Sequence, residues 1–230
     1  MLKKSLTYLF LVTLLVLNSS CFDILEEINL KKDGSGTMLI TVNMSKSKTK
    51  LASIMLLDSI NGYKVPSEDD IELALNDVMA HLKKSKGITN IKQTKDFENY
   101  IFSVSCDFES IESLNGITAH LIQEQNKRES TKFETSNFAY NATEKVFERK
   151  FTYDASIKKS FDYLKKEDKK VFQDASFTAI YRFEDQIEET SNTIAKIAPS
   201  KKAVMLRVDA MSFILGEKTI KNKVKLINSK

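Results

Sequence analysis

The fold is decided by the stretch Ile24-Leu-Glu-Glu-Ile-Asn-Leu-Lys-Lys-Asp-Gly-Ser-Gly-Thr-Met-Leu-Ile-Thr-Val-Asn-Met44. Its first part places Ile24, Ile28 and Leu30 on one face of an extended chain, interrupted only by Glu26. Its second part alternates again, with Met38, Ile40, Val42 and Met44 on one face. The Gly-rich run at 33–36 lies between the two parts and is a strong turn signal. The stretch therefore predicts a β-hairpin.

The turn of this hairpin resembles a calcium loop only superficially. An EF-hand needs a bidentate Glu at its twelfth position, and the twelfth residue from Asp33 is Met44. A phosphate-binding loop needs Gly-Lys-Ser/Thr after the glycines, and Gly36 is followed by Thr37 and Met38. We therefore interpret residues 33–36 as a turn and assign no cofactor or metal to them.

The remainder of the chain switches repeatedly between strand and helix periodicity. Alternation of apolar residues predicts strands at 88–97, 100–108, 133–140, 145–153, 176–184, 193–197, 203–208 and 220–227. Helical spacing predicts helices at 45–57, 67–87, 111–125, 157–164 and 213–215, the second opened by a capping box at Ser67 to Asp70. This pattern predicts an α+β fold, with antiparallel β-hairpins interleaved with and packed against helices. No change in composition marks a boundary, so we expect a single domain over residues 21–230.

Composition and charge narrow the class of protein. Of 230 residues, 42% are hydrophobic and 29% charged, as in a globular domain. The formal net charge is +4, and Lys3 and Lys4 account for two of these charges, which leaves the remainder nearly balanced. Lysine pairs are spread among acids, which is typical of solvated faces and argues against a nucleic-acid partner. A second interpretation of the basic clusters is attraction to anionic lipid headgroups.

The N-terminal segment has the three parts of an export signal. A basic start at Lys3 and Lys4 is followed by an apolar run from Leu6 to Leu17, and then by Asn18-Ser-Ser-Cys21. The apolar run is about a dozen residues, shorter than the ~20 that a membrane-spanning helix needs. Residues 1–20 are therefore predicted to be a cleaved signal peptide.

The end of this segment resembles the lipobox of a bacterial lipoprotein. Ser19 and Ser20 match the two small positions and Cys21 matches the modified one, while Asn18 stands where Leu or Val is usual, as in the looser lipoboxes of Bacteroidota. The resemblance implies that Cys21 is lipidated and anchors the chain to a membrane. Phe22 takes the place of the aspartate that holds such proteins at the inner membrane, which favours the outer membrane. An ordinary secretory signal and a retained membrane anchor are the alternatives.

The Gly-rich first hairpin and the closing strands loosely resemble LppM-like lipoprotein domains, and several short motifs of the mature part resemble uncharacterised Bacteroidota lipoproteins. These motifs are Cys21-Phe-Asp-Ile24, Lys32-Asp-Gly-Ser-Gly36, Ser191-Asn192 and Pro199-Ser-Lys-Lys-Ala203. The resemblance implies an anchored α+β module of the cell envelope without established catalysis. It assigns no functional residue beyond Cys21.

No group of residues predicts catalysis or metal binding. His81 and His120 lie on different predicted helices, and neither has the spacing of a zinc site. Cys106 falls on an apolar strand face, which is typical of a buried thiol. The acidic runs Glu26-Glu27, Glu68-Asp-Asp70 and Glu188-Glu189 are expected at exposed edges and helix starts. We therefore expect a protein that is not an enzyme, with no catalytic, cofactor-binding or metal-binding residue.

Two binding hypotheses follow, and a third class stays open. The first is a non-enzymatic envelope module, anchored to the membrane by its lipid, that binds a protein, lipid or glycan partner. The alternative is a domain that binds a lipid or another small ligand in an apolar cavity, which could be lined by Met38, Met44, Met55 and Met79. These methionines fit a plain core as well. An envelope hydrolase would need a cleft lined by several acids.

Overall fold

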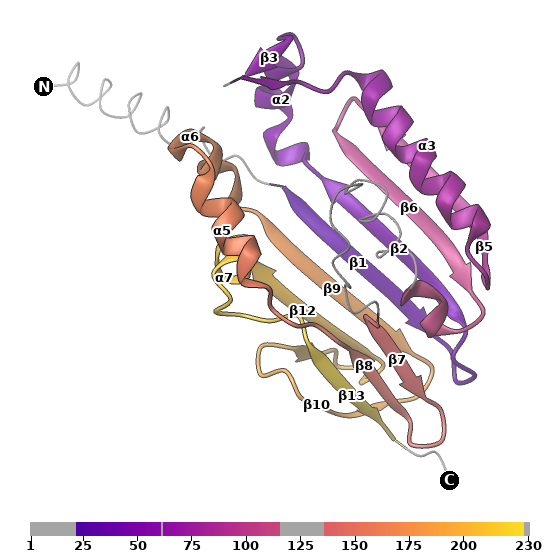
Figure 1. Ribbon diagram of the computed structural model, residues 1–230. Helices are drawn as coiled ribbons and strands as arrows, with labels where there is room; N and C mark the ends of the chain where they lie inside the picture. The colour runs from indigo at the N-terminus through magenta and orange to yellow at the C-terminus, as the bar shows by residue number, and fades with distance from the viewer. Residues whose placement is uncertain (1–21, 61, 116–135, 228–230) are drawn as a thin grey trace, which may run out of the picture.

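The computed structural model describes residues 22–60, 62–115 and 136–227. Within these ranges the strands form a seven-stranded sheet, a four-stranded sheet and a two-stranded hairpin. The order of strands is β11-β12-β9-β1-β2-β6-β5 in the larger sheet and β10-β13-β8-β7 in the smaller one. Helices lie beside the sheets, so the fold is α+β, as the periodicities predict (Figure 1).

The bounds of the elements are as follows. The larger sheet contains β1 (Asp23–Leu30), β2 (Gly36–Asn43), β5 (Ile88–Asp96), β6 (Ile101–Phe108), β9 (Ser176–Phe183), β11 (Lys196–Ile197) and β12 (Ala203–Asp209). The smaller sheet contains β7 (Phe138–Asn141), β8 (Val146–Arg149), β10 (Ile187–Thr190) and β13 (Asn222–Leu226), and the separate hairpin contains β3 (Ser59–Ile60) and β4 (Tyr63–Lys64). The helices are α2 (Lys48–Ile54), α3 (Glu68–Lys84), α5 (Ala155–Tyr163), α6 (Lys166–Lys169) and α7 (Ala210–Ile214), with short 3₁₀ helices η1 (Ser45–Ser47), η2 (Ile111–Leu114) and η3 (Lys170–Phe172).

The hairpin predicted from the opening stretch is confirmed as β1 and β2. Its turn needs two glycines for different reasons. Gly34 has a φ of +87°, which side chains rarely allow. A Cβ on Gly36 would lie 2.0 Å from the carbonyl oxygen of Asn29 on the facing strand. The Asp33 carboxylate accepts a hydrogen bond of 2.9 Å from the backbone N–H of Ser35 and closes the turn.

The position of β1 was not predicted. It lies in the middle of the seven-stranded sheet, where it pairs antiparallel with β2 and parallel with β9. The sequence pattern predicted antiparallel pairs alone, and the parallel pair between residues 23–30 and 176–183 departs from it. Alternation shows which face of a strand is buried, but it does not show which strand lies beside it.

The long helix α3 follows its predicted start. Ser67 caps it, and the reciprocal hydrogen bonds of the capping box join Ser67 and Asp70. The helix lies along β5 at one edge of the sheet (Figure 1). Helical spacing predicts that its buried face carries Ile71, Ala74, Leu75, Val78 and Leu82. Of these, Leu82 is fully buried and Ala74 is exposed. Because α3 packs on β5, the edge strand of the sheet, fewer of its side chains are buried than in a helix that packs over central strands.

Other predicted elements are shorter or displaced. The strand expected at 193–197 is reduced to β11, and β10 precedes it, because the Asn192 side chain bonds the carbonyls of Thr219 and Lys221 and turns the chain there. The strands expected at 133–140 and 145–153 are limited to β7 and β8 in the described residues. Of the helix expected at 111–125, only η2 lies in a described range.

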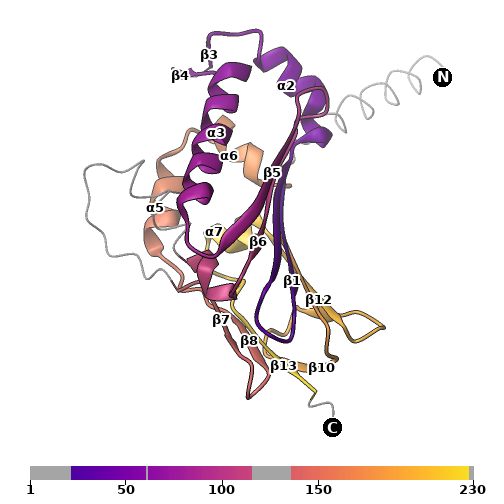
Figure 2. The same cartoon turned by 90° about the vertical axis from the view of Figure 1, so that its right-hand side faces the viewer.

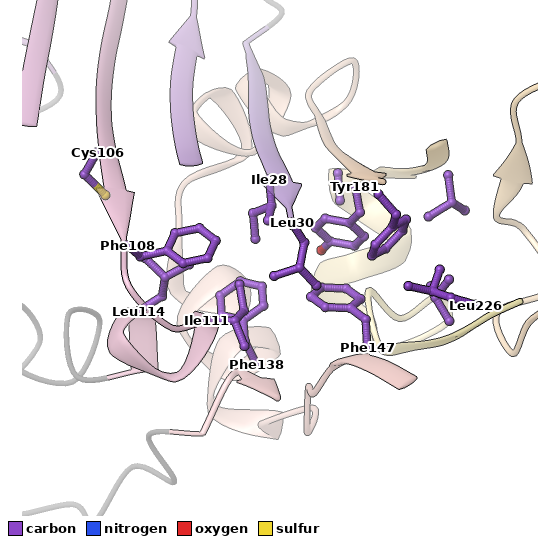
Figure 3. Close-up of a cluster of buried hydrophobic side chains, with 14 of the residues drawn as sticks. Ile28, Leu30, Cys106, Phe108, Ile111, Leu114, Phe138, Phe147, Tyr181 and Leu226 are labelled. Carbon is purple, nitrogen blue, oxygen red and sulfur yellow. The ribbon is translucent and has the colours of Figure 1, made fainter. Parts of the chain in front are cut away.

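The main buried cluster spans both sheets. Ile28 and Leu30 from β1 and Tyr181 from β9 meet Phe147, which comes from β8 of the smaller sheet (Figure 3). The ring centroids of Phe147 and Tyr181 are 4.9 Å apart. The helices α3, α5, α6 and α7 lie on one side of the larger sheet (Figure 2). The face of the larger sheet that these helices and the smaller sheet cover is therefore the core face.

Candidate functional site

The candidate site is the end of the larger sheet where β1 begins. The predicted lipidation site Cys21 lies outside the described residues, and β1 starts two positions after it, at Asp23. Only Phe22 therefore separates the predicted anchor from a central strand of the sheet.

Asp23 joins three elements at this end. Its carboxylate accepts hydrogen bonds from the hydroxyl of Ser176 on β9 and from Nζ of Lys46 on η1, the latter at 2.8 Å. Arg207 of β12 lies 3.4 Å away. Burial opposes ionisation of this group, but the Lys46 and Ser176 hydrogen bonds and the nearby cations outweigh it and lower the pKa of Asp23. An ionised carboxylate thus fixes the first residue of β1 to its neighbours.

Phe22 is fixed by an aromatic contact. Its ring meets that of Phe172 edge-on, with 5.9 Å between centroids, and Phe172 meets Phe161 of α5 in the same way at 5.6 Å. The backbone carbonyl of Phe22 accepts a hydrogen bond from the N–H of Ser176. The chain is therefore held to η3 and α5 from its first described residue onward.

Cys106 is buried in the core face of β6, as its alternation predicted (Figure 3). Burial, with a smaller contribution from the charge of Asp107, raises the pKa of its thiol to about 11. A thiol with such a pKa is protonated at neutral pH, so it is a poor nucleophile.

The histidines do not form a site in the described part of the chain. His81 lies in the last turn of α3 and is half-buried. His120 lies outside the described residues. Among the residues that the structure describes, no three His, Cys, Asp or Glu side chains gather closely enough to hold a metal ion.

The acidic runs have three different roles, and for one of them the expectation was wrong. Glu68 to Asp70 form the first turn of α3, and Glu188 and Glu189 lie on β10 with exposed side chains, as expected. Glu26, by contrast, is buried with 4% of its surface exposed. It was expected at an exposed edge, but β1 is a central strand, and Glu26 points into the junction between the sheets.

Glu26 is the centre of a buried polar network. Nε and Nη2 of Arg149 on β8 each donate a 3.2 Å hydrogen bond to the Glu26 carboxylate, and the Tyr181 hydroxyl donates another of 2.6 Å. The guanidinium also lies over the Phe138 ring, 4.5 Å from its centroid. The network joins the two sheets, and its carboxylate, guanidinium and hydroxyl are hydrogen-bonded to one another.

A second carboxylate joins the two sheets near the turns at their far end. Asp185, which follows β9, accepts from Nζ of Lys32 at 2.8 Å and from Nζ of Lys145 at 2.7 Å. The Asp185 side chain is 5% exposed, whereas that of Lys32 is 58% exposed.

A groove lies on the smaller sheet, in the described part of the chain. It has a volume of about 180 Å³ and is lined by Glu189, Thr190, Ser191, Lys223 and Lys225. Ligand sites for drug-sized molecules measure ~300–1,000 Å³. The four methionines considered as a cavity lining, Met38, Met44, Met55 and Met79, are each half-buried on β2, near η1, after α2 and on α3, and none lines this groove.

No described helix has the length and apolar character to cross a bilayer.

Neither a protein-family model nor a curated protein matches the chain. Among solved structures, the chain is similar to the NMR structure of the folded domain of the Mycobacterium tuberculosis protein LppM. The alignment covers 91% of each chain, with 8% sequence identity and a TM-score of 0.40. This is a loose likeness of fold, and it assigns neither a residue nor a function to this chain.

Proposed function

We propose that the chain is a lipoprotein of the bacterial cell envelope, anchored through Cys21, whose folded part binds a partner and does not catalyse a reaction. The observation that carries the proposal is the position of β1. The strand begins two residues after the cysteine of the lipobox-like motif, and Phe22 and Asp23 are already held by Phe172, Ser176 and Lys46. An anchor at Cys21 would hold the domain against the membrane on a tether of one residue.

The binding role is supported by the chemistry of the described residues. Cys106 is protonated at neutral pH, the buried charges are paired, and the groove is smaller than a usual ligand site. These features favour a partner bound on the surface. Binding of a lipid or other small ligand is the alternative, and native mass spectrometry of the purified protein would reveal a retained acyl species.

The anchor is tested by metabolic labelling with an alkyne fatty acid. Cys21→Ala should lose the label and leave the membrane fraction, because the thiol that takes the diacylglycerol is gone. Cys106→Ala is the matched control, since it removes the other cysteine of the chain. It should keep the fatty-acid label and stay in the membrane fraction. Label that persists in Cys21→Ala, or that is absent from the unchanged protein, would overturn the proposal.

The outer-membrane location is tested at the next position. We expect Phe22→Asp to move the protein from outer-membrane to inner-membrane fractions on a density gradient, with the label at Cys21 retained. If the unchanged protein and Phe22→Asp were distributed alike between the two membranes, residue 22 would not determine the membrane in which the protein is found. Cross-linking that recovers no reproducible partner would count against the binding role.

A further inference from the structure

Exposed apolar side chains gather in one short segment beyond α2. Leu56, Leu57, Ile60 and Tyr63 are 86%, 49%, 40% and 58% exposed. We call these four residues the apolar tip. The other exposed large apolar side chains of the described part are spread along the chain, which is ordinary for a protein surface: Leu73, Tyr163, Ile197, Met205, Leu215 and Ile227. Four such residues within eight positions are not ordinary.

The apolar tip is a built structure that projects from the domain. Its two short strands β3 and β4 form an antiparallel hairpin around Gly62, and a Cβ on Gly62 would meet no atom within 4 Å. The base of the tip is fixed by a hydrogen bond of 3.0 Å from the Val65 N–H to the Asp58 carbonyl, and Val65 itself is buried. The fold therefore holds these apolar side chains outward.

The apolar tip lies at the end of the molecule where β1 begins. The last residue of β2, Asn43, pairs with Asp23 of β1. Lys46, on the turn that follows β2, forms an ion pair with the carboxylate of Asp23. From there α2 leads to the tip. Figures 1 and 2 both place α2 and β3 at the end of the molecule opposite β7, β8, β10 and β13.

A second segment at this end is rich in lysine. Residues Ala155 to Phe172, which we call the lysine segment, contain six lysines and three acids, a net charge of +3. The lysines are Lys158, Lys159, Lys165, Lys166, Lys169 and Lys170. Tyr163 in the same segment is 90% exposed. Phe172 holds the segment against Phe22, and therefore against the residue that follows the predicted anchor.

We propose that the apolar tip and the lysine segment together dock the domain onto the surface of the anionic phospholipid bilayer that holds the Cys21 lipid. Leucine and aromatic side chains enter the boundary between headgroups and acyl chains, where they lose contact with water. Lysines close to the surface are attracted to anionic headgroups. Both arrangements occur here at the end of the sheet where the chain outside the described residues begins. The inference rests on the proposed anchor and adds an orientation to it.

The absence of tryptophan from the chain provides the test. Leu56→Trp introduces a single reporter at the apolar tip, and Ile197→Trp introduces one at an exposed isoleucine on β11, at the other end of the larger sheet. The lipidated full-length proteins are placed in vesicles of phosphatidylcholine and phosphatidylglycerol that include brominated lipids. We expect blue-shifted emission and strong quenching for Leu56→Trp, and water-like emission without quenching for Ile197→Trp. Equal behaviour of the two reporters would overturn the proposal.

The electrostatic part is tested by neutralising Lys165, Lys166 and Lys170 with glutamine in the Leu56→Trp protein. A lysine near an anionic surface changes the partition by about fivefold, so the ratio of docked to undocked protein should fall by about two orders of magnitude. The same fall should follow when phosphatidylglycerol is omitted. Quenching that responds to neither change would show that charge plays no part and would overturn this half of the proposal.

The two proposals fail in different ways. The fatty-acid label reports on Cys21 alone, and the tryptophan signal reports on the apolar tip. A labelled protein with an unquenched Leu56→Trp keeps the anchor and loses the docking surface. An unlabelled protein whose Leu56→Trp is still quenched by added vesicles keeps the docking surface without the anchor. Concentration-dependent burial of the reporter without vesicles would assign the tip to a second copy of the chain and overturn the membrane as its occupant.

Discussion

The larger sheet buries charged side chains in one region, and the segment beside another region of it exposes apolar ones. Where the smaller sheet packs on it, charged side chains are buried and each has a partner, as the contacts among Glu26, Arg149 and Tyr181 show. Where β1 begins, large apolar side chains are exposed on the apolar tip. Buried charges without partners and exposed apolar clusters both cost free energy, so each arrangement needs a reason. The first is explained by pairing within the domain. The second has no partner in the described residues and points outside the domain.

The strongest way to break this comparison is to remove Arg149. Arg149→Met should lower the free energy of unfolding by about 3–5 kcal/mol, because Glu26 is left buried without its cation. Adding Glu26→Leu should recover about half of the loss, with the rest due to the unpaired hydroxyl of Tyr181. Urea unfolding of the single and double variants measures both values. A single variant as stable as the unchanged protein would mean that the network is not buried as described.

The second carboxylate that joins the sheets should contribute less. Asp185→Asn is expected to lower the free energy of unfolding by about 1–2 kcal/mol, because Lys145, which is 19% exposed, loses its anion, while Lys32 is largely exposed and can turn to water. Lys32→Gln serves as a control and should change the free energy of unfolding by no more than about 0.5 kcal/mol. If Asp185→Asn cost as much as Arg149→Met, the exposure of Lys32 would not explain a smaller contribution of Asp185.

Cys106 gives the core a sensitivity to alkaline pH. Its pKa in the folded protein, about 11, lies above the ordinary value of 9.0, so the fold favours the protonated thiol. The contribution of the protonated Cys106 thiol to the free energy of unfolding is complete below pH 9. It declines as the pH rises towards 11, and roughly 1 kcal/mol of it is lost by pH 10. Cys106→Ala should be less stable at neutral pH but should lack this decline. Parallel pH profiles from urea unfolding of the two proteins would contradict the assignment.

The smallest effect on stability is expected at the apolar tip. Leu56→Asn should change the free energy of unfolding by no more than about 0.5 kcal/mol, since the side chain already faces water. Leu82→Ala, at a buried leucine of α3, should cost about 2–5 kcal/mol by the same measurement. A loss above about 1 kcal/mol for Leu56→Asn would mean that the tip packs within the domain, and it would weaken the argument for a docking surface.

The local elements could be predicted from the sequence, because their signals are local. The first hairpin follows from alternation around Gly34 and Gly36, and the start of α3 follows from the capping box at Ser67. The second sheet could not be predicted, since its strands come from distant parts of the chain. Glu26 was recognised as an interruption of an apolar face, but its partner Arg149 is 123 residues away.

The candidate site was predictable only in part. The lipobox-like motif predicts lipidation of Cys21 from the neighbouring residues alone, and this stays a prediction. The structure adds what surrounds Asp23, where the chain enters the sheet. The exposure of Leu56 and Leu57 could not be inferred, because at helical spacing they continue the pattern of α2 and would be expected to pack. The contact between Phe22 and Phe172 depends on tertiary structure for the same reason as the pair of Glu26 and Arg149.

The parallel pair of β1 and β9 also sets an order in time. The two residues that begin this pair, Asp23 and Ser176, are 153 positions apart. At a synthesis rate of roughly 5–20 residues per second, β1 waits roughly 8–30 s before its partner is made. Over that interval β1 can pair with β2, but its other edge stays open to strands of other chains. Whatever occupies or shields that edge before β9 is made affects how much of the protein reaches its folded state.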